Sequence, residues 1–139
     1  MRKVLLVLVL LIQLPIALLA QNVEIDKQTN LVSVDGKETF YLTQKNKRLM
    51  VCDYSLENLQ HQELAYLKYT KYGSNEAYAM VFTQSGNQCL LTGFGAFGVL
   101  KRLAKMIAGS NLVQNNMVSE IEERKFLILH NGTFVKDQA

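Results

Sequence analysis

The sequence predicts an α+β domain, in which an antiparallel β-meander of six to seven strands packs against a C-terminal helix and a second helical segment. Three observations support this prediction. Apolar and polar residues alternate with a period of two for about seventy residues after position 20. The connections between the alternating runs are short, which favours antiparallel neighbours over crossover units. Apolar residues then take helical spacing over residues 96–108.

The chain begins with the features of a secretory signal peptide. Two basic residues precede an unbroken apolar run over residues 4–12, and Ala20 stands before a polar segment. A retained membrane anchor is the alternative, but the apolar stretch is short for a bilayer and Pro15 interrupts it. We therefore expect residues 1–20 to be a cleaved signal peptide. Residues 21–139 would then form a single domain, exported to the periplasm or secreted, with no integral membrane segment.

The charge of the expected mature chain is close to neutral. Without the two cations of the signal peptide it carries 13 basic and 12 acidic residues, a formal net charge of +1. A chain with this balance has no overall field that attracts polyanions. We therefore expect no nucleic-acid partner.

The first four strands follow from alternating residues and one strong turn signal. Asp35 and Gly36 separate two alternating runs, and this pair favours a type I′ hairpin because both central residues need positive φ. Residues expected on the inner face of the first three strands are Val23, Ile25, Val32, Val34, Phe40 and Leu42. The next strand would place Met50, Cys52, Tyr54 and Leu56 inwards and Val51, Asp53, Ser55 and Glu57 outwards.

Three further strands are separated by turns at residues 60–62, 73–75 and 85–87. Their expected inner faces carry Ala65, Leu67 and Tyr69, then Tyr78, Met80 and Phe82, then the run that begins at Cys89.

The helix predicted over residues 96–108 has a wide apolar face and a narrow basic stripe. The apolar residues are Phe97, Val99, Leu100, Leu103, Ala104, Met106 and Ile107, and the stripe is Lys101, Arg102 and Lys105. So wide a face indicates burial against the sheet and a second element. The stripe could contact anionic lipid, although a helix packed on its own sheet would look the same, and we favour that interpretation.

A second helical segment is expected near the C-terminus. Either Asn116 or Ser119 could cap it, with acidic residues in its first turn. Residues 126–130 fit either a continuation of this helix or a short strand. The triplet 131–133 matches a glycosylation site, and we interpret it as a turn.

Three glycines, Gly93, Gly95 and Gly98, stand at the spacing of a dinucleotide-binding loop between a strand and a helix. The wider context argues against this function, because no strand with an acidic residue follows the helix at the required distance. We interpret the glycines as a strand-to-helix corner and expect no cofactor.

Cys52 and Cys89 are the two cysteines of the chain. In an oxidising compartment they could form a disulfide that stabilises the fold by about 4 kcal/mol. The alternative is two buried thiols that pack as small apolar side chains. The sequence leaves both open. A zinc site that adds His61 and His130 is disfavoured, because the four residues lack the close spacing of zinc ligands.

No catalytic motif is recognised. His61 lies in an expected turn and His130 near Gly132, and we interpret both as surface residues and not as acid–base catalysts. No serine stands in a nucleophile motif. We interpret Asp53, Glu57 and Glu63 as solvated strand residues, although chemistry by paired carboxylates stays open. The sequence thus favours a non-enzymatic protein.

Tyrosines are expected on the outer face of the sheet. Tyr66 and Tyr72 share this face in the predicted register, and Tyr41 is a candidate for it. An exposed aromatic strip could bind a carbohydrate or a protein, but tyrosine also suits any half-buried sheet surface. These tyrosines and the basic stripe are the candidate partner surface.

Three segments resemble parts of short exported proteins of unknown function from Bacteroidota bacteria: "VDGKETFYL", "DYSLENLQHQELAYLKY" and "LKRLAKMIAGSNLVQNNMVSEIEERKFL". The resemblance covers most of the mature chain and implies export and a shared fold. It carries no catalytic motif and hence no functional residues to transfer.

We expect an exported, non-enzymatic module that binds an unknown protein or small ligand. One alternative is a small hydrolase-like enzyme with an unrecognised acidic or histidine site, which a cleft gathering Asp53, Glu57, Glu63 or His61 would favour. Another is a protein that attaches to a membrane surface through the basic helix.

Overall fold

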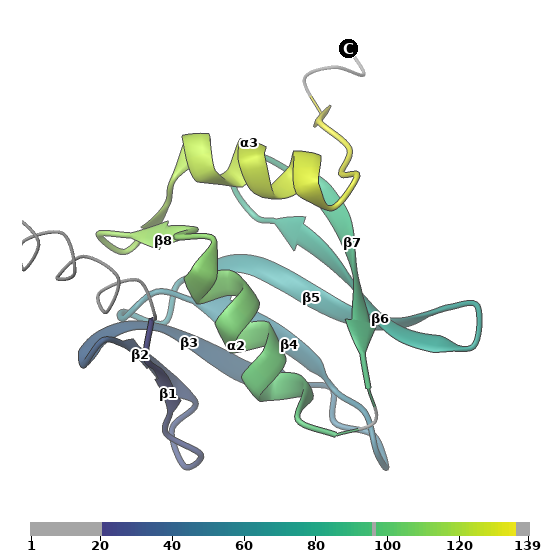
Figure 1. Ribbon diagram of the computed structural model, residues 1–139, viewed down its shortest axis with the longest axis horizontal. Helices are drawn as coiled ribbons and strands as arrows, with labels where there is room; N and C mark the ends of the chain where they lie inside the picture. Colours follow the sequence, from purple (N-terminus) through teal and green to yellow (C-terminus); the bar gives the residue numbers. More distant parts are fainter. Residues whose placement is uncertain (1–20, 96, 136–139) are drawn as a thin grey trace, which may run out of the picture.

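The computed structural model describes residues 21–95 and 97–135. The expected signal peptide, residues 1–20, lies outside the described residues. The described chain contains a seven-stranded antiparallel sheet whose strands are ordered as in the sequence, followed by two helices with a short hairpin between them (Figure 1). This confirms the predicted α+β class and the meander.

The elements have the following bounds. The sheet consists of β1 (Val23–Ile25), β2 (Leu31–Val34), β3 (Lys37–Lys45), β4 (Asp53–Glu57), β5 (Glu63–Tyr72), β6 (Asn75–Phe82) and β7 (Gln88–Phe94). After it come α2 (Val99–Gly109), β8 (Val113–Gln114), β9 (Met117–Val118) and α3 (Glu120–Leu129).

The predicted turn between β2 and β3 is present. Val34 pairs with Lys37 across a two-residue turn, and both central residues have positive φ, 52° at Asp35 and 79° at Gly36. This is the backbone that a type I′ hairpin requires.

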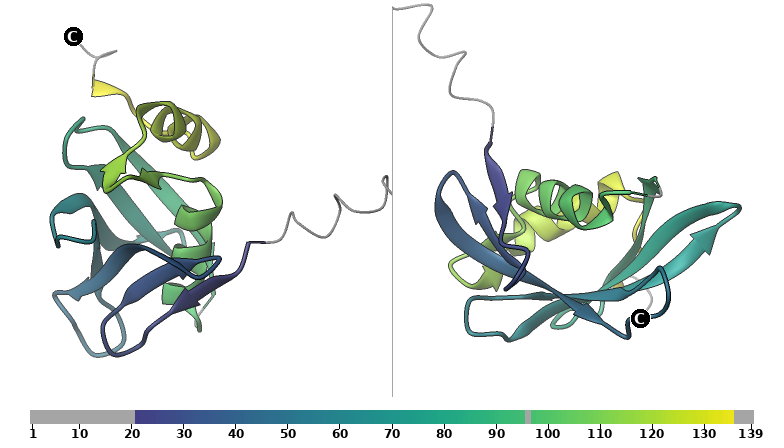
Figure 2. Two further views of the ribbon diagram at one scale, coloured as in Figure 1. Left: turned by 90° about the vertical axis from the view of Figure 1, so that its left-hand side faces the viewer. Right: turned by 90° about the horizontal axis from the view of Figure 1, so that it is seen from below.

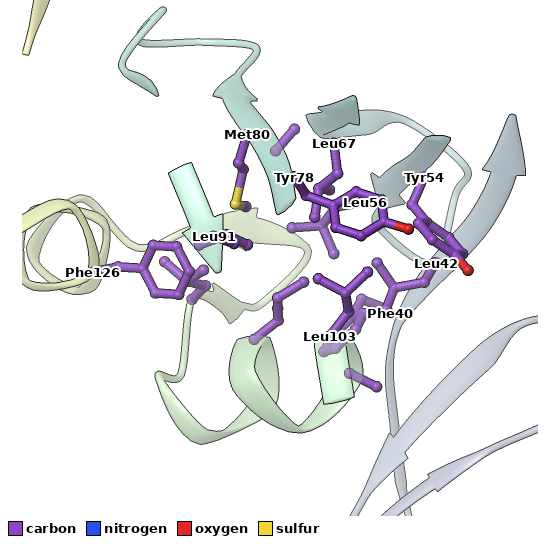
Figure 3. Packing of buried hydrophobic residues seen from close by; sticks show 14 of the residues in the cluster. Phe40, Leu42, Tyr54, Leu56, Leu67, Tyr78, Met80, Leu91, Leu103 and Phe126 are labelled. Carbon is purple, nitrogen blue, oxygen red and sulfur yellow. The ribbon is translucent and has the colours of Figure 1, made fainter. Parts of the chain in front are cut away.

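The core lies on the concave face of the curved sheet, where both helices are found (Figure 2). Sheet residues predicted to face inwards, such as Leu42, Leu56, Leu67 and Met80, are fully buried there. They meet Leu103 of α2, and Phe126 of α3 lies beside Leu91 (Figure 3). The hollow of the sheet is thus filled by side chains of the protein itself.

The start of α2 differs from the prediction. The helix begins at Val99, and its N-cap is Gly98 in the left-handed conformation, with φ 72°. This backbone turns the chain out of the helix, so Phe97 does not join the apolar face and is 86% exposed. The buried residues of α2 are Leu103, Ala104, Ile107 and Ala108.

The glycine-rich stretch before α2 is a corner, as predicted. Gly93 and Gly98 both have positive φ, which favours glycine. Within the described residues, the strand after α2 is β8, which pairs antiparallel with β9 alone. The parallel strand that a dinucleotide-binding unit requires after the helix is therefore not formed there.

In the C-terminal segment, the structure decides which residue caps the second helix and whether residues 126–130 are helix or strand. Ser119 is the N-cap of α3, and its side chain accepts a hydrogen bond from the backbone N–H of Glu122. Asn116 instead lies in the turn between β8 and β9 with φ 62°. Helix α3 continues to Leu129, so the "KFLIL" run is helical and not a strand.

The two cysteines are free, buried thiols, so the disulfide alternative is wrong. Tyr54 pairs with Leu67, Leu67 with Met80, and Met80 with Cys89, which places Cys89 three strands away from β4. Three strand spacings amount to about 14 Å. Because Cys52 stands two residues before Tyr54, the thiols are well beyond the reach of a disulfide, which needs Cα atoms within about 7 Å.

Candidate functional site

Polar side chains of β4 form a buried network on the outer face of the sheet. Asp53, Ser55 and Glu57 expose only 3%, 0% and 7% of their surface. The prediction that the two acids are solvated is therefore wrong. Alternation does point them away from the core, but side chains of β3, β5 and the adjoining connections cover them.

Asp53 completes the hydrogen bonding where β4 begins. The last paired residues at this end are Tyr54 and Leu67, and β5 extends beyond them. One oxygen of Asp53 accepts the backbone N–H of Tyr69 at 2.8 Å, and the other accepts the hydroxyl of Tyr66 at 2.8 Å. Burial alone would raise the pKa of Asp53, but these hydrogen bonds, one from Asn46 and the charge of Arg48 outweigh it and lower that pKa.

Glu57 orients His61. The Oε1 atom of Glu57 accepts the hydroxyl of Thr43 at 2.8 Å and lies 3.0 Å from Nδ1 of His61. The imidazole ring also stacks on Tyr41, with 4.2 Å between the ring centroids. Burial would raise the pKa of Glu57, but the hydrogen bonds from His61 and Thr43 and the charge of Lys45 lower it.

The turn that carries His61 is held on both sides. Asn58 accepts the backbone N–H groups of Gln60 and Gln62 with its Oδ1 atom, and its Nδ2 donates to the carbonyl of Asn116. Asn116 in return accepts the backbone N–H of Leu59. The turn between β4 and β5 is thus fastened to the β8–β9 hairpin.

A carboxylate–histidine pair could act as a general base, but the network lacks the arrangement of a nucleophilic site. The Ser55 hydroxyl donates to Glu63 at 2.7 Å, so it is bound to a carboxylate and not to His61. Among the described residues, no three His, Cys, Asp or Glu side chains gather at the distances of a metal site. The network's hydrogen bonds thus serve the sheet and its turns.

His130 lies elsewhere, against Phe126 of α3, with 4.4 Å between the ring centroids. Its Nε2 atom is buried without a hydrogen-bond partner, and burial lowers the pKa of His130. The two histidines predicted as surface residues thus have different environments, because only His61 is exposed.

Hollows on the surface of the described residues include a groove and a smaller depression. A groove of about 490 Å³ lies between the β2–β3 hairpin, the end of α2 and the β8–β9 hairpin, and it is lined by polar side chains such as Lys37, Asn111 and Gln114. A smaller hollow of about 230 Å³ lies beside the β4–β5 turn. Of the four residues whose gathering would favour catalysis, only Glu63 lines either of these hollows.

The three candidate tyrosines do not form one exposed strip. Tyr41 stacks on His61, and Tyr66 is bonded to Asp53. Only Tyr72, at the β5–β6 turn, is mostly exposed. Lys101, Arg102 and Lys105 lie exposed on α2, on the side away from its buried residues.

One end of the sheet carries a set of exposed apolar side chains that the sequence pattern did not predict. In a meander, alternate connections share an end, so the described residues of four connections, 26–30, 46–52, 73–74, and 95 with 97–98, lie at the same end of the sheet; we call it the loop end. In Figure 1 the first two of these connections lie at the bottom and α3 lies at the top. Leu49, Met50 and Phe97, all in loop-end connections, each expose at least 86% of their surface.

The tip of the β3–β4 connection forces two of these side chains outwards. The backbone N–H of Arg48 donates to the carbonyl of Val51 at 2.8 Å and closes the tip, with Leu49 and Met50 as its central residues. Met50 was expected on the inner face of a strand, and this expectation is wrong because β4 begins only at Asp53. The signal in the sequence was the polar run "QKNKR" followed by the adjacent apolar residues "LMVC", which breaks the alternation.

The described residues include no helix with the length and apolar character needed to span a bilayer. In the comparisons with known proteins, neither a family model, nor a curated protein, nor a solved structure matches this chain.

Proposed function

We propose that the protein is an exported, non-enzymatic module that acts by binding a partner at its loop end. The observation that carries this proposal is the near-complete exposure of Leu49, Met50 and Phe97 in connections that share one end of the sheet. Burying one such side chain stabilises a contact by about 1.5–3 kcal/mol. A surface that gathers three of them is a candidate for an interaction site.

The carboxylates of the β4 network are used in hydrogen bonds within the protein, and this supports a binding function over catalysis. Asp53 and Glu57 are engaged by backbone, hydroxyl and amide donors, and Ser55 is bonded to Glu63. A hydrolase-like site would need a nucleophile near the exposed histidine and a cleft for the substrate. The groove beside Lys37 and Asn111 lies outside this network and is a less specific candidate for a small ligand.

The test is site-specific photo-crosslinking in cells that export the protein. A photoreactive residue replaces Leu49 in one variant and Ile128, an exposed apolar residue of α3, in a matched control. We expect crosslinked adducts, to a protein or to lipid, from position 49 and few from position 128. Equal yields from both positions, or adducts from position 128 alone, would contradict the proposed binding surface.

A further inference from the structure

The charges of the molecule are distributed unevenly between its ends. Within four residues of the loop-end connections stand seven cations, Lys27, Lys45, Lys47, Arg48, Lys71, Lys101 and Arg102, and four acids, Glu24, Asp26, Asp53 and Glu76. This end therefore has a formal charge of +3. The remaining described residues comprise five cations and seven acids, a formal charge of −2.

Cations and apolar side chains of the loop end stand next to each other. Lys47 and Arg48 directly precede Leu49 and Met50 at the tip of the β3–β4 connection. Arg48 is held at this place because its guanidinium lies 3.4 Å from the buried carboxylate of Asp53, while the Arg48 side chain keeps 56% of its surface exposed.

A second group of cations lies next to the connection that carries Phe97. The guanidinium of Arg102 lies so close to Gly95 that a Cβ atom there would be 3.1 Å from its Nη1. Lys101 is exposed in the first turn of α2, immediately after this connection. Positive charge thus accompanies both exposed apolar sites of the loop end.

We infer that the partner of the loop end is an anionic bilayer surface, an inference that rests on the proposed function. Cations at such a surface meet negative headgroups, while apolar side chains enter the boundary between headgroups and acyl chains. Leu49 and Met50 project from the tip of one connection and Phe97 from another, and none of the three lines either of the two hollows described above. A fluid surface can accept separate tips without matching pockets.

Charge disfavours a symmetric contact between the loop ends of two copies of the chain. Two loop ends that face each other would bring +3 against +3, and like charges in an interface are repulsive. The acidic remainder of the molecule would also be repelled by anionic lipid, so the fold itself orients the loop end towards the bilayer.

The experiment is vesicle co-sedimentation with the protein isolated from the exported fraction. It compares phosphatidylcholine vesicles with vesicles that also contain phosphatidylglycerol, at low and high salt, and a single-stranded oligonucleotide serves as a second polyanion. We expect binding to the anionic vesicles that weakens as salt rises. Leu49→Ser/Met50→Ser should lower the partition coefficient at least about tenfold, because two apolar side chains are removed.

Two further variants separate charge from apolar contact. Lys47→Gln/Lys101→Gln should weaken binding to anionic vesicles by about tenfold or more, since each cation near such a surface contributes about fivefold. Ile128→Ser/Leu129→Ser, which removes exposed apolar side chains from α3 at the other end, should change it less than about twofold. All substituted side chains are exposed, and far-ultraviolet circular dichroism verifies that each variant is folded.

Several results would overturn the inference: no binding to either vesicle, equal binding to both, equal losses in the α3 variant, or binding to the oligonucleotide alone. If the vesicles are not bound while position 49 still crosslinks to a protein, the lipid partner is wrong and the proposed binding surface remains. If both experiments fail, the proposed function fails as well.

Discussion

Asp53 shows how a single side chain can replace a missing strand partner. Its carboxylate accepts the backbone N–H of Tyr69 beyond the last paired residues of β4 and β5. An unpaired N–H group in a buried position would cost about 1–3 kcal/mol. Alternation predicted that Asp53 points outwards from the core. Its burial could not be predicted, because Asp53 is covered by Tyr66 and the β3–β4 connection, and no local sequence pattern indicates where these lie.

We predict that Asp53→Asn reduces the loss of stability in acid. The folded-state pKa of Asp53 is lowered, so its ionised form stabilises the fold above the ordinary pKa of about 4, and this stabilisation is lost as pH falls through the folded-state value. Urea unfolding between neutral pH and about pH 2 measures the effect. The variant should be less stable at neutral pH and show a shallower decline below about pH 4. An unchanged slope would contradict the assigned role.

Gly132 is required for close packing at the end of α3. A Cβ atom there would lie 2.6 Å from Cδ2 of Leu127 and 2.9 Å from the carbonyl oxygen of Gln88. The backbone of Gln88 cannot move freely, because it exchanges hydrogen bonds with Thr133.

Gly132→Ala should therefore lower the free energy of unfolding by about 1–3 kcal/mol, the usual cost of overpacking. Gly109→Ala is the matched control, since a Cβ atom at this position in α2 would meet nothing within 4 Å. Alanine there should be neutral or stabilising by up to about 1 kcal/mol. Thermal or urea unfolding compares the two, and equal effects would contradict the packing argument.

At the level of elements, the meander was predictable because its signals are local. Period-two alternation identified the strands, and Asp35-Gly36 identified a hairpin that needs positive φ at both positions. The start of α2 was not predictable to the residue, because Gly98 sets it through a left-handed conformation. The start of α3 was also open, because Asn116 and Ser119 were both candidate caps. The structure assigns the cap to Ser119.

Strand order also determines the state of the cysteines. Because β5 and β6 separate β4 from β7, we predict that Cys52 and Cys89 stay reduced even in an oxidising compartment. Burial raises the pKa of Cys89 to about 12, which disfavours the reactive thiolate. Alkylation in denaturant without reductant, followed by mass spectrometry, should modify both thiols. Protein that takes up no label until it is reduced would contradict the strand order.

At the scale of the whole molecule, the net charge conceals the distribution that the fold creates. The sequence total for the expected mature chain is +1, yet the meander collects a charge of +3 at the loop end. Lys47 and Lys101 are far apart in the sequence and share an end only because alternate connections of the sheet do. The sequence could identify the basic stripe of α2, but it could not assign these cations and Leu49 to one surface.

The most direct test of the loop end as the binding surface is the environment of residue 49 in the bound protein. An environment-sensitive fluorophore is attached to the cysteine of the Leu49→Cys variant. The same dye is attached at the opposite end in the Ile128→Cys variant, and the buried Cys52 and Cys89 remain unlabelled. With anionic vesicles, we predict a blue shift and protection from an aqueous quencher at position 49, and neither change at position 128. A label at position 49 that stays in water while the protein is bound, or immersion of position 128 instead, would contradict the account.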